Sequence, residues 1–143
     1  MSGTALVERY LDCVNRGDAE GLAALYAVDG VVYEPLSSEP VKGRQAIAAV
    51  FSAFKRAIPD LEWRLVRPLV ENGERIAFEV AVTGVNDGPL ATPEGELPPT
   101  GRAVSVEMAL FETLDADGLI AEERGYFDAT GFAAQLGMAT TGT

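Results

Sequence analysis

The chain has 143 residues, which fits one domain, and its hydrophobic fraction of 48% is ample for a core. Its net charge of −11 and its pI near 4.3 argue against nucleic acid and anionic membranes as partners. No apolar run is long enough to span a bilayer, and the N-terminus lacks the segments of a signal peptide, so we expect a cytoplasmic protein.

The sequence contains no histidine. An imidazole is therefore absent from any nucleophile pair and from any zinc site built on the usual ligands. Acid–base chemistry has to come from Asp, Glu, Tyr or Lys. We expect neither a metal nor a cofactor.

Helical spacing of apolar residues marks the start of the chain. It predicts a helix over residues 4–16 with Tyr10 on the apolar face. Asp18 can cap a second short helix that carries Leu22 and Tyr26 on its apolar side. A buried tyrosine hydroxyl requires a hydrogen-bond partner, so Tyr10 predicts a polar site within the core.

Glu34 ends a short apolar strand predicted over residues 31–34 and stands directly before Pro35. A carboxylate in that position can lie at the mouth of the core. Burial raises the pKa of a carboxyl group and makes it a usable base near neutral pH. Glu34 and Tyr10 directed into one apolar cavity would be the working groups of a proton-transfer enzyme.

The apolar period changes to alternation after a third predicted helix, over residues 44–57. Alternation predicts four strands, over residues 61–70, 76–83, 103–114 and 119–128. Asn72-Gly73 and Asp117-Gly118 predict hairpin turns. A proline-rich loop over 86–101 and a short helix or turn over 129–136 complete a single domain, residues 1–137. We expect the tail, 138–143, to be disordered.

Helices followed by antiparallel strands predict an α+β fold rather than alternating parallel units. The long strands carry apolar residues on both faces, which indicates a curved sheet with helices and a pocket on one side. The other side would need cover. A second copy of the chain would supply it, so we expect a homodimer that forms through the sheet face.

Short motifs in both halves of the chain point to one superfamily. In the first half they are Arg9-Tyr10-Leu11, Gly17-Asp18, Tyr26-Ala27, Glu34-Pro35 and Ser38-Glu39-Pro40, and this half resembles the ketosteroid isomerases. In the second half they are Pro98-Pro99-Thr100-Gly101-Arg102, Asp117-Gly118-Leu119-Ile120, Arg124-x-Tyr126-Phe127-Asp128 and Gln135-Leu136-Gly137, and this half resembles the SnoaL-like polyketide cyclases. Both belong to the nuclear transport factor 2-like superfamily. The resemblance implies a cone-shaped α+β fold, a curved antiparallel sheet wrapped around the N-terminal helices, with an internal pocket.

The resemblance also implies roles for individual residues. Tyr10 matches the oxyanion-binding tyrosine of the isomerases, and Glu34 matches their base, with Glu in place of Asp. The second acid of the isomerases falls near Met108 or Ala109, where no acid stands. Glu107 is the nearest carboxylate and also the interior candidate for the acid of the cyclases. Glu107 and Glu34 would then share proton removal and proton donation.

The predicted function is therefore acid–base proton transfer, a cyclisation or an isomerisation, on an apolar carbonyl compound that is polyketide- or steroid-like. We expect the substrate to contact Trp63, Phe54, Phe78, Met108, Leu90, Tyr126, Asp128 and Arg124. Two alternatives are open. Glu34 and Glu62 could open an epoxide, or the chain could be a non-catalytic module for ligand binding or dimerisation.

Overall fold

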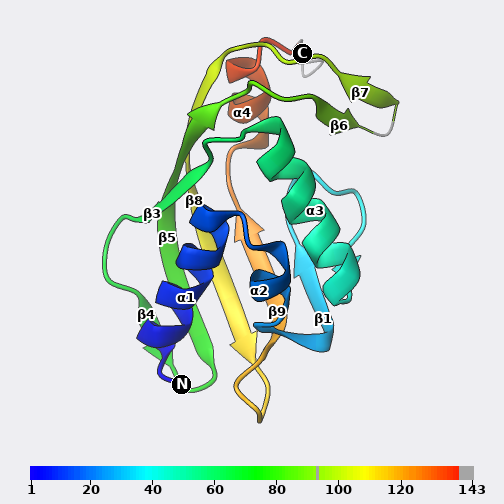
Figure 1. Ribbon diagram of the computed structural model, residues 1–143. Helices are drawn as coiled ribbons and strands as arrows, with labels where there is room; N and C mark the ends of the chain where they lie inside the picture. The colour runs from blue at the N-terminus through cyan, green and yellow to red at the C-terminus, as the bar shows by residue number, and fades with distance from the viewer. Residues whose placement is uncertain (93, 139–143) are drawn as a thin grey trace.

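The computed structural model describes residues 1–92 and 94–138, so the predicted tail lies outside the described residues from position 139 onward. In these residues the helices are α1 (Gly3–Arg16), α2 (Ala19–Ala23), α3 (Arg44–Ala57) and α4 (Ala129–Gln135). The strands are β1 (Tyr26–Tyr33), β2 (Val41–Lys42), β3 (Glu62–Leu65), β4 (Val70–Asn72), β5 (Arg75–Val85), β6 (Leu90–Thr92), β7 (Gly95–Leu97), β8 (Ala103–Leu114) and β9 (Ile120–Tyr126). The helices lie against one curved sheet, as Figure 1 shows.

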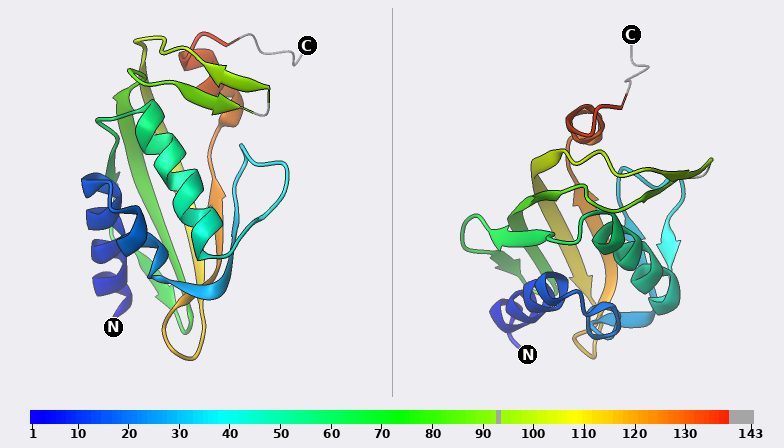
Figure 2. Two further views of the ribbon diagram at one scale, coloured as in Figure 1. Left: turned by 45° about the vertical axis from the view of Figure 1, so that its right-hand side comes forward. Right: turned by 45° about the horizontal axis from the view of Figure 1, so that its top comes forward.

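The sheet follows the order β2-β1-β9-β8-β5-β3, and β4 pairs with the other end of β5. All of its pairs are antiparallel except β1 and β9, which run parallel. The predicted α+β class and curved sheet are confirmed, with this parallel pair as the one departure from an antiparallel sheet. Figure 2 shows α1, α2 and α3 on the same side of the sheet, and β6 with β7 as a separate hairpin.

Helix α1 begins and ends where its sequence provides caps. The Ser2 side chain accepts a hydrogen bond from the Ala5 amide at 3.1 Å, and Gly17 ends the helix with a φ of 71°, a left-handed conformation that glycine adopts without strain. The predicted apolar face is the buried face. It places Tyr10 in the core with 3% of its surface exposed.

Two predicted elements differ from the structure at their ends. Helix α2 stops at Ala23, and Tyr26 begins β1 because its main chain pairs with Ile120 of β9. The strand predicted over 61–70 is divided into β3 and β4, which both pair with β5. Pro68 lies between them and has no amide hydrogen to give to the ladder.

The outer face of the sheet carries a small aromatic pair. Phe111 of β8 is 38% exposed and Tyr126 of β9 is 54% exposed, and their rings meet edge to face at 5.8 Å. The homodimer expected through this face stays a prediction. Among the described helices, each is too short or too polar to cross a membrane.

Candidate active site

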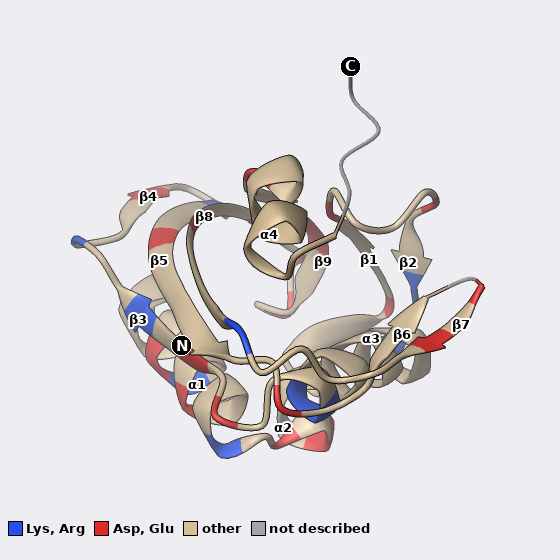
Figure 3. Cartoon of the chain, turned by 90° about the horizontal axis from the view of Figure 1, so that it is seen from above, with Lys and Arg blue, Asp and Glu red and all other residues tan. Residues whose placement is uncertain are grey.

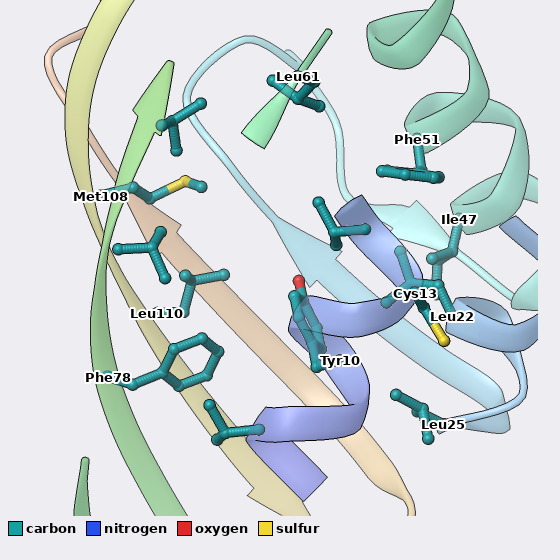
Figure 4. Packing of buried hydrophobic residues seen from close by; sticks show 14 of the residues in the cluster. Tyr10, Cys13, Leu22, Leu25, Ile47, Phe51, Leu61, Phe78, Met108 and Leu110 are labelled. Carbon is teal, nitrogen blue, oxygen red and sulfur yellow. The ribbon is translucent and has the colours of Figure 1, made fainter. Parts of the chain in front are cut away.

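A cavity of about 130 Å³ lies between the concave face of the sheet and the helices. Aliphatic and aromatic side chains form most of its wall, among them Val14, Leu22, Ile47, Phe51, Ile58 and Phe132. Seen from above in Figure 3, the sheet curls around the interior and α4 lies across its end, and α4 contributes Phe132 to the wall. Figure 4 shows the Tyr10 hydroxyl pointing into the space between the side chains of the sheet and those of α3.

Glu123 of β9 is the centre of a polar cluster in this wall. Its Oε1 accepts a hydrogen bond from the Tyr10 hydroxyl and one from the Tyr26 hydroxyl, each 2.8 Å long. The two hydroxyl oxygens are 3.3 Å apart. Glu123 is 5% exposed and Tyr26 is 1% exposed, so the cluster is shielded from bulk water. A hydrogen bond to a charged acceptor is roughly twice as strong as one between neutral groups.

Both phenols remain protonated in this setting. Burial raises the pKa of Tyr10 well above its ordinary value, and the negative charge of Glu123 raises it further. The pKa of Tyr26 is raised well above its ordinary value by burial and by the charge of Glu123. Each phenol has one hydroxyl proton, and each donates it in a hydrogen bond to Glu123. Tyr10 is therefore a hydrogen-bond donor to Glu123, and its role toward a substrate oxyanion stays a prediction.

Glu112 of β8 lies behind this cluster and does not form part of the cavity wall. It is 1% exposed and stands directly opposite Glu123 in the β8–β9 ladder. Burial raises the pKa of Glu112 well above its ordinary value, and the charge of Glu123 acts in the same direction.

Glu34 occupies another part of the wall, in the turn that follows β1. Its Oε2 accepts a hydrogen bond from the Leu36 amide at 2.8 Å. Its Oε1 is buried and has no hydrogen-bond partner among the described residues. The turn therefore fixes the carboxylate through one oxygen and leaves the lone pairs of the other unused.

Gly125 separates Glu34 from Glu123. It lies two residues after Glu123 on the same face of β9, a distance of about 6.6 Å along a strand. A Cβ atom placed on Gly125 would be 3.9 Å from Glu34 Cβ and 3.6 Å from Met108 Sδ. The missing side chain keeps the space between the two carboxyl groups open.

Trp63 of β3 adds a second unpaired polar atom to the wall, since its Nε1 is buried without a partner among the residues described. Its ring centroid is 5.9 Å from that of Tyr10. The Asn15 side chain accepts a hydrogen bond from the Trp63 amide at 2.7 Å and donates one to its carbonyl at 3.0 Å. These two bonds fix the edge strand to α1 and hold the indole beside the polar cluster.

Five residues predicted for the site lie in the cavity wall: Glu34, Tyr10, Trp63, Phe54 and Met108. Their roles in catalysis or binding stay predictions. The sequence reasoning missed Glu123, Tyr26 and Glu112, although Tyr26 was identified within a motif.

The interior position predicted for Glu107 is wrong. Side chains alternate between the two faces of a strand, and the buried residues of β8 are the even-numbered Val104, Met108, Leu110 and Glu112. Glu107 is exposed on the outer face and lies outside the cavity wall.

Two apolar residues predicted to contact substrate lie elsewhere. Phe78 is buried beneath the site, where its ring meets that of Tyr10 edge to face at 5.7 Å. Leu90 belongs to β6 and packs against the edge of the core. Neither forms part of the cavity wall.

In the Arg124-x-Tyr126-Phe127-Asp128 motif, Phe127 belongs to the cavity wall and the other three named residues do not. The Arg124 guanidinium lies 4.1 Å from the Tyr33 ring centroid and bonds to Glu122, and Tyr126 is exposed on the outer face. Asp128 caps α4 by accepting a hydrogen bond from Gly131 at 2.9 Å. All three lie outside the cavity wall, and their predicted substrate contacts stay predictions.

The carboxylate partner proposed for epoxide opening also lies elsewhere. Glu62 of β3 is exposed and forms an ion pair with Arg64 at 3.8 Å. It is not part of the cavity wall. Within the described residues, no group of three His, Cys, Asp or Glu side chains could hold a metal ion.

The sequence profile of the SnoaL-like domain matches residues 7–123. This chain belongs to the SnoaL-like domain family. A steroid Δ-isomerase of Nocardioides simplex is 32% identical to it over 123 residues, which are 86% of this chain and 87% of the isomerase. The epoxide hydrolase LasB of Streptomyces lasalocidi is 31% identical over 122 residues, 85% of this chain, but the match spans only 39% of LasB.

Solved structures agree with this family. A protein of Catenulispora acidiphila with a ketosteroid isomerase-like fold superposes with a TM-score of 0.78 at 17% identity, and the match covers 96% of both chains. A candidate polyketide cyclase of Xanthomonas campestris superposes with a TM-score of 0.77 at 26% identity, covering 93% of this chain and 95% of that one. The predicted superfamily is confirmed, and the prediction of an isomerase- or cyclase-type enzyme is confirmed at that level.

Proposed function

We propose that the cavity binds an apolar carbonyl compound and that Glu34 transfers a proton within it, in an isomerisation or a cyclisation. The observation that carries this proposal is the carboxylate of Glu34. One of its oxygens is fixed by the Leu36 amide, and the other is buried and unpaired in an apolar wall. A carboxylate that is held in position and has unused lone pairs can accept a proton from a bound carbon acid.

Tyr10 would stabilise the oxygen that gains charge as Glu34 removes the proton. In the structure its hydroxyl donates a hydrogen bond to Glu123. An enolate or alkoxide oxygen is more basic than a carboxylate and therefore attracts that proton more strongly. Tyr26 would continue to donate to Glu123. Tyr10 can turn to the substrate while Glu123 retains one hydrogen bond.

The spacing of these groups supports a substrate that extends over both. Gly125 lies about 6.6 Å along β9 from Glu123 and leaves the space beside Glu34 open. A flat, ring-shaped carbonyl compound would fill this space with its carbonyl oxygen near Tyr10 and an acidic carbon near Glu34. The named activity of the Nocardioides simplex relative favours a ketosteroid as the first compound to test.

The test is the isomerisation of a Δ5-3-ketosteroid, followed through the ultraviolet absorbance of the conjugated ketone. Glu34→Gln removes the proton acceptor and keeps the shape of the side chain. We expect kcat to fall by about 10²–10⁴-fold, while the affinity for 2-naphthol, an apolar phenol used as the binding probe, changes little. Glu39→Gln is the matched control, because Glu39 is exposed in the same loop.

An equal loss of rate and affinity in Glu34→Gln would contradict the assignment of Glu34 as the base. Binding of the probe without turnover of the ketosteroid or of a polyketide-type diketone would favour the non-catalytic alternative.

Epoxide opening is a second candidate, supported by the relative LasB and by the presence of two carboxyl residues in one cavity wall. The pair would be Glu34 and Glu123, since Glu62 faces outward. The protein would be incubated with an aryl epoxide carrying a distant hydroxyl group, and the cyclic ether or diol would be measured by chromatography. Retention of this activity in Glu34→Gln would exclude Glu34 from the pair.

A further inference from the structure

Glu112 and Glu123 bring two carboxyl groups together beneath the cavity. They are direct partners in the antiparallel ladder between β8 and β9, and both side chains point to the inner face. Directly opposite residues on one face have their Cβ atoms about 4.5–5.5 Å apart, and like charges in that arrangement destabilise the sheet. Two ionised carboxylates at this position would repel each other in a region that is shielded from bulk water.

The surroundings of Glu112 offer no compensation for a charge. Both of its oxygens are buried and lack a hydrogen-bond partner among the described residues. The titratable groups that face it are Glu123 on β9, Tyr10 on α1 and Tyr26 on β1. None of the ion pairs in the described part of the chain includes either Glu112 or Glu123. An unpaired buried charge is among the most costly features a fold can contain.

We propose that the pair shares one proton, which resides on Glu112, and that the Glu112 hydroxyl donates a hydrogen bond to the Glu123 carboxylate. This arrangement removes the repulsion and gives the buried Glu112 a partner. Glu123 then accepts from three donors, the Glu112 hydroxyl and the phenols of Tyr10 and Tyr26. Glu112 lies outside the cavity wall, so it is a positioning residue that acts through Glu123.

The direction of the Glu112 pKa agrees with this assignment, since burial and Glu123 both raise it. The linkage to stability follows from that sign. The folded state holds the proton that the unfolded chain releases above about pH 4.3, so the stabilising effect of the proton is lost as the pH rises from there through the folded-state pKa. Because this stabilising effect disappears when Glu112 loses its proton, the protein should be less resistant to urea at alkaline pH.

The importance of the pair for turnover rests on the proposed function, but its protonation does not. As long as Glu112 holds its proton, the Glu123 end of the cavity carries a single negative charge, and Tyr10 can release its hydrogen bond to a developing oxyanion. A second charge would hold Tyr10 more tightly to the pair. We therefore expect the rate of ketosteroid isomerisation to fall at alkaline pH.

The experiment compares the full chain with Glu112→Gln and with Glu107→Gln. Glu107 is the matched control because it lies on the same strand and is exposed on the opposite face. Carbon NMR of protein labelled at the Glu carboxyl carbons should show one protonated carboxyl group near neutral pH. That signal should be absent in Glu112→Gln and present in Glu107→Gln. The urea midpoint of Glu112→Gln should exceed that of the parent at about pH 8 and match it near about pH 4.

A spectrum of the parent protein in which every Glu carboxyl is ionised at neutral pH would overturn the proposal, whether or not Glu112→Gln folds. An alkaline fall of the urea midpoint that persists in Glu112→Gln would overturn it as well. The outcome for Glu34 is separate. Loss of the proposed function would leave the NMR and urea results unchanged, whereas absence of the shared proton would leave the comparison of Glu34→Gln with Glu39→Gln as the test of the base.

Discussion

The two carboxyl residues of the cavity wall, Glu34 and Glu123, are held in different ways. A main-chain amide fixes Glu34 through one oxygen, and its other oxygen has no partner in the part of the chain that the structure describes. Glu123 is held by the side chains of Tyr10 and Tyr26 and faces Glu112. The support of Glu34 therefore does not depend on another side chain. A change at Glu123 alters every group that depends on it. This contrast is the basis for proposing proton transfer at Glu34, and stability with oxyanion support at the Glu123 cluster.

The largest expected effect separates the two residues by stability. Glu123→Leu leaves the phenols of Tyr10 and Tyr26 and the carboxyl group of Glu112 without their acceptor. We expect the free energy of unfolding to fall by about 2–4 kcal/mol, because each unsatisfied buried group costs roughly 1–3 kcal/mol and the new leucine recovers part of the loss. Urea denaturation near neutral pH measures this difference.

Glu34→Leu is the matched change at the other carboxylate and should lower the free energy of unfolding by about 1 kcal/mol or less, since it removes one hydrogen bond near the surface. Equal losses in the two variants would show that the Glu123 cluster is no more important to the fold than the Glu34 turn.

The next effect distinguishes the two phenols. Tyr10→Phe and Tyr26→Phe each remove one hydrogen bond to Glu123, so each should cost about 1 kcal/mol of stability. Only Tyr10→Phe should lower kcat for the ketosteroid, by about 10–100-fold, because Tyr10 turns to the substrate while Tyr26 remains on Glu123. Steady-state kinetics on both variants provides the comparison. A larger rate loss in Tyr26→Phe would reverse the roles.

A third change closes the space between the two carboxyl groups. Gly125→Leu would fill the gap beside Glu34 and Met108 and should weaken 2-naphthol binding by about tenfold, or about 1.4 kcal/mol. Gly125→Ala is the control, since its Cβ would make only ordinary contacts of 3.6–3.9 Å. Calorimetric titration measures both affinities. Unchanged binding in the leucine variant would mean that the ligand lies elsewhere in the cavity.

The sequence predicted the helices and the position of Tyr10 because the apolar residues of α1 repeat at a clear helical spacing. It predicted Glu34 at the cavity because a polar residue that follows an apolar strand and precedes a proline has few other places to lie. These signals are local. They need no knowledge of which strand pairs with which.

The face of a strand is not a local property, and this explains the error at Glu107. Strand β8 carries apolar residues on both faces, Met108 and Leu110 inside and Ala109 and Phe111 outside. Alternation alone therefore could not identify the inner face. The decision between Glu107 and Glu112 depends on which side the helices pack, and only the structure supplies this.

Tyr26 and Glu123 were missed for a related reason. Tyr26 fitted the apolar side of a predicted helix, but its pairing with Ile120 draws it into β1. The recognisable motif contains the even-numbered residues Arg124, Tyr126 and Asp128. The β9 side chain that reaches the cavity wall is that of the odd-numbered Glu123, which precedes the motif.

The smallest expected effect concerns Asp128, which the sequence placed in the cavity and the structure places at the start of α4. Its carboxylate accepts the Gly131 amide, so Asp128→Ala should lower the free energy of unfolding by about 1 kcal/mol, and Asp128→Asn should retain most of that stability. Thermal denaturation measures the loss, and 2-naphthol titration should show unchanged affinity in both variants. Helix α4 still contributes Phe132 to the wall, so its end can fray only slightly before binding responds. Weaker binding in Asp128→Asn with unchanged stability would place Asp128 at the ligand, whereas a loss confined to stability would limit Asp128 to capping α4.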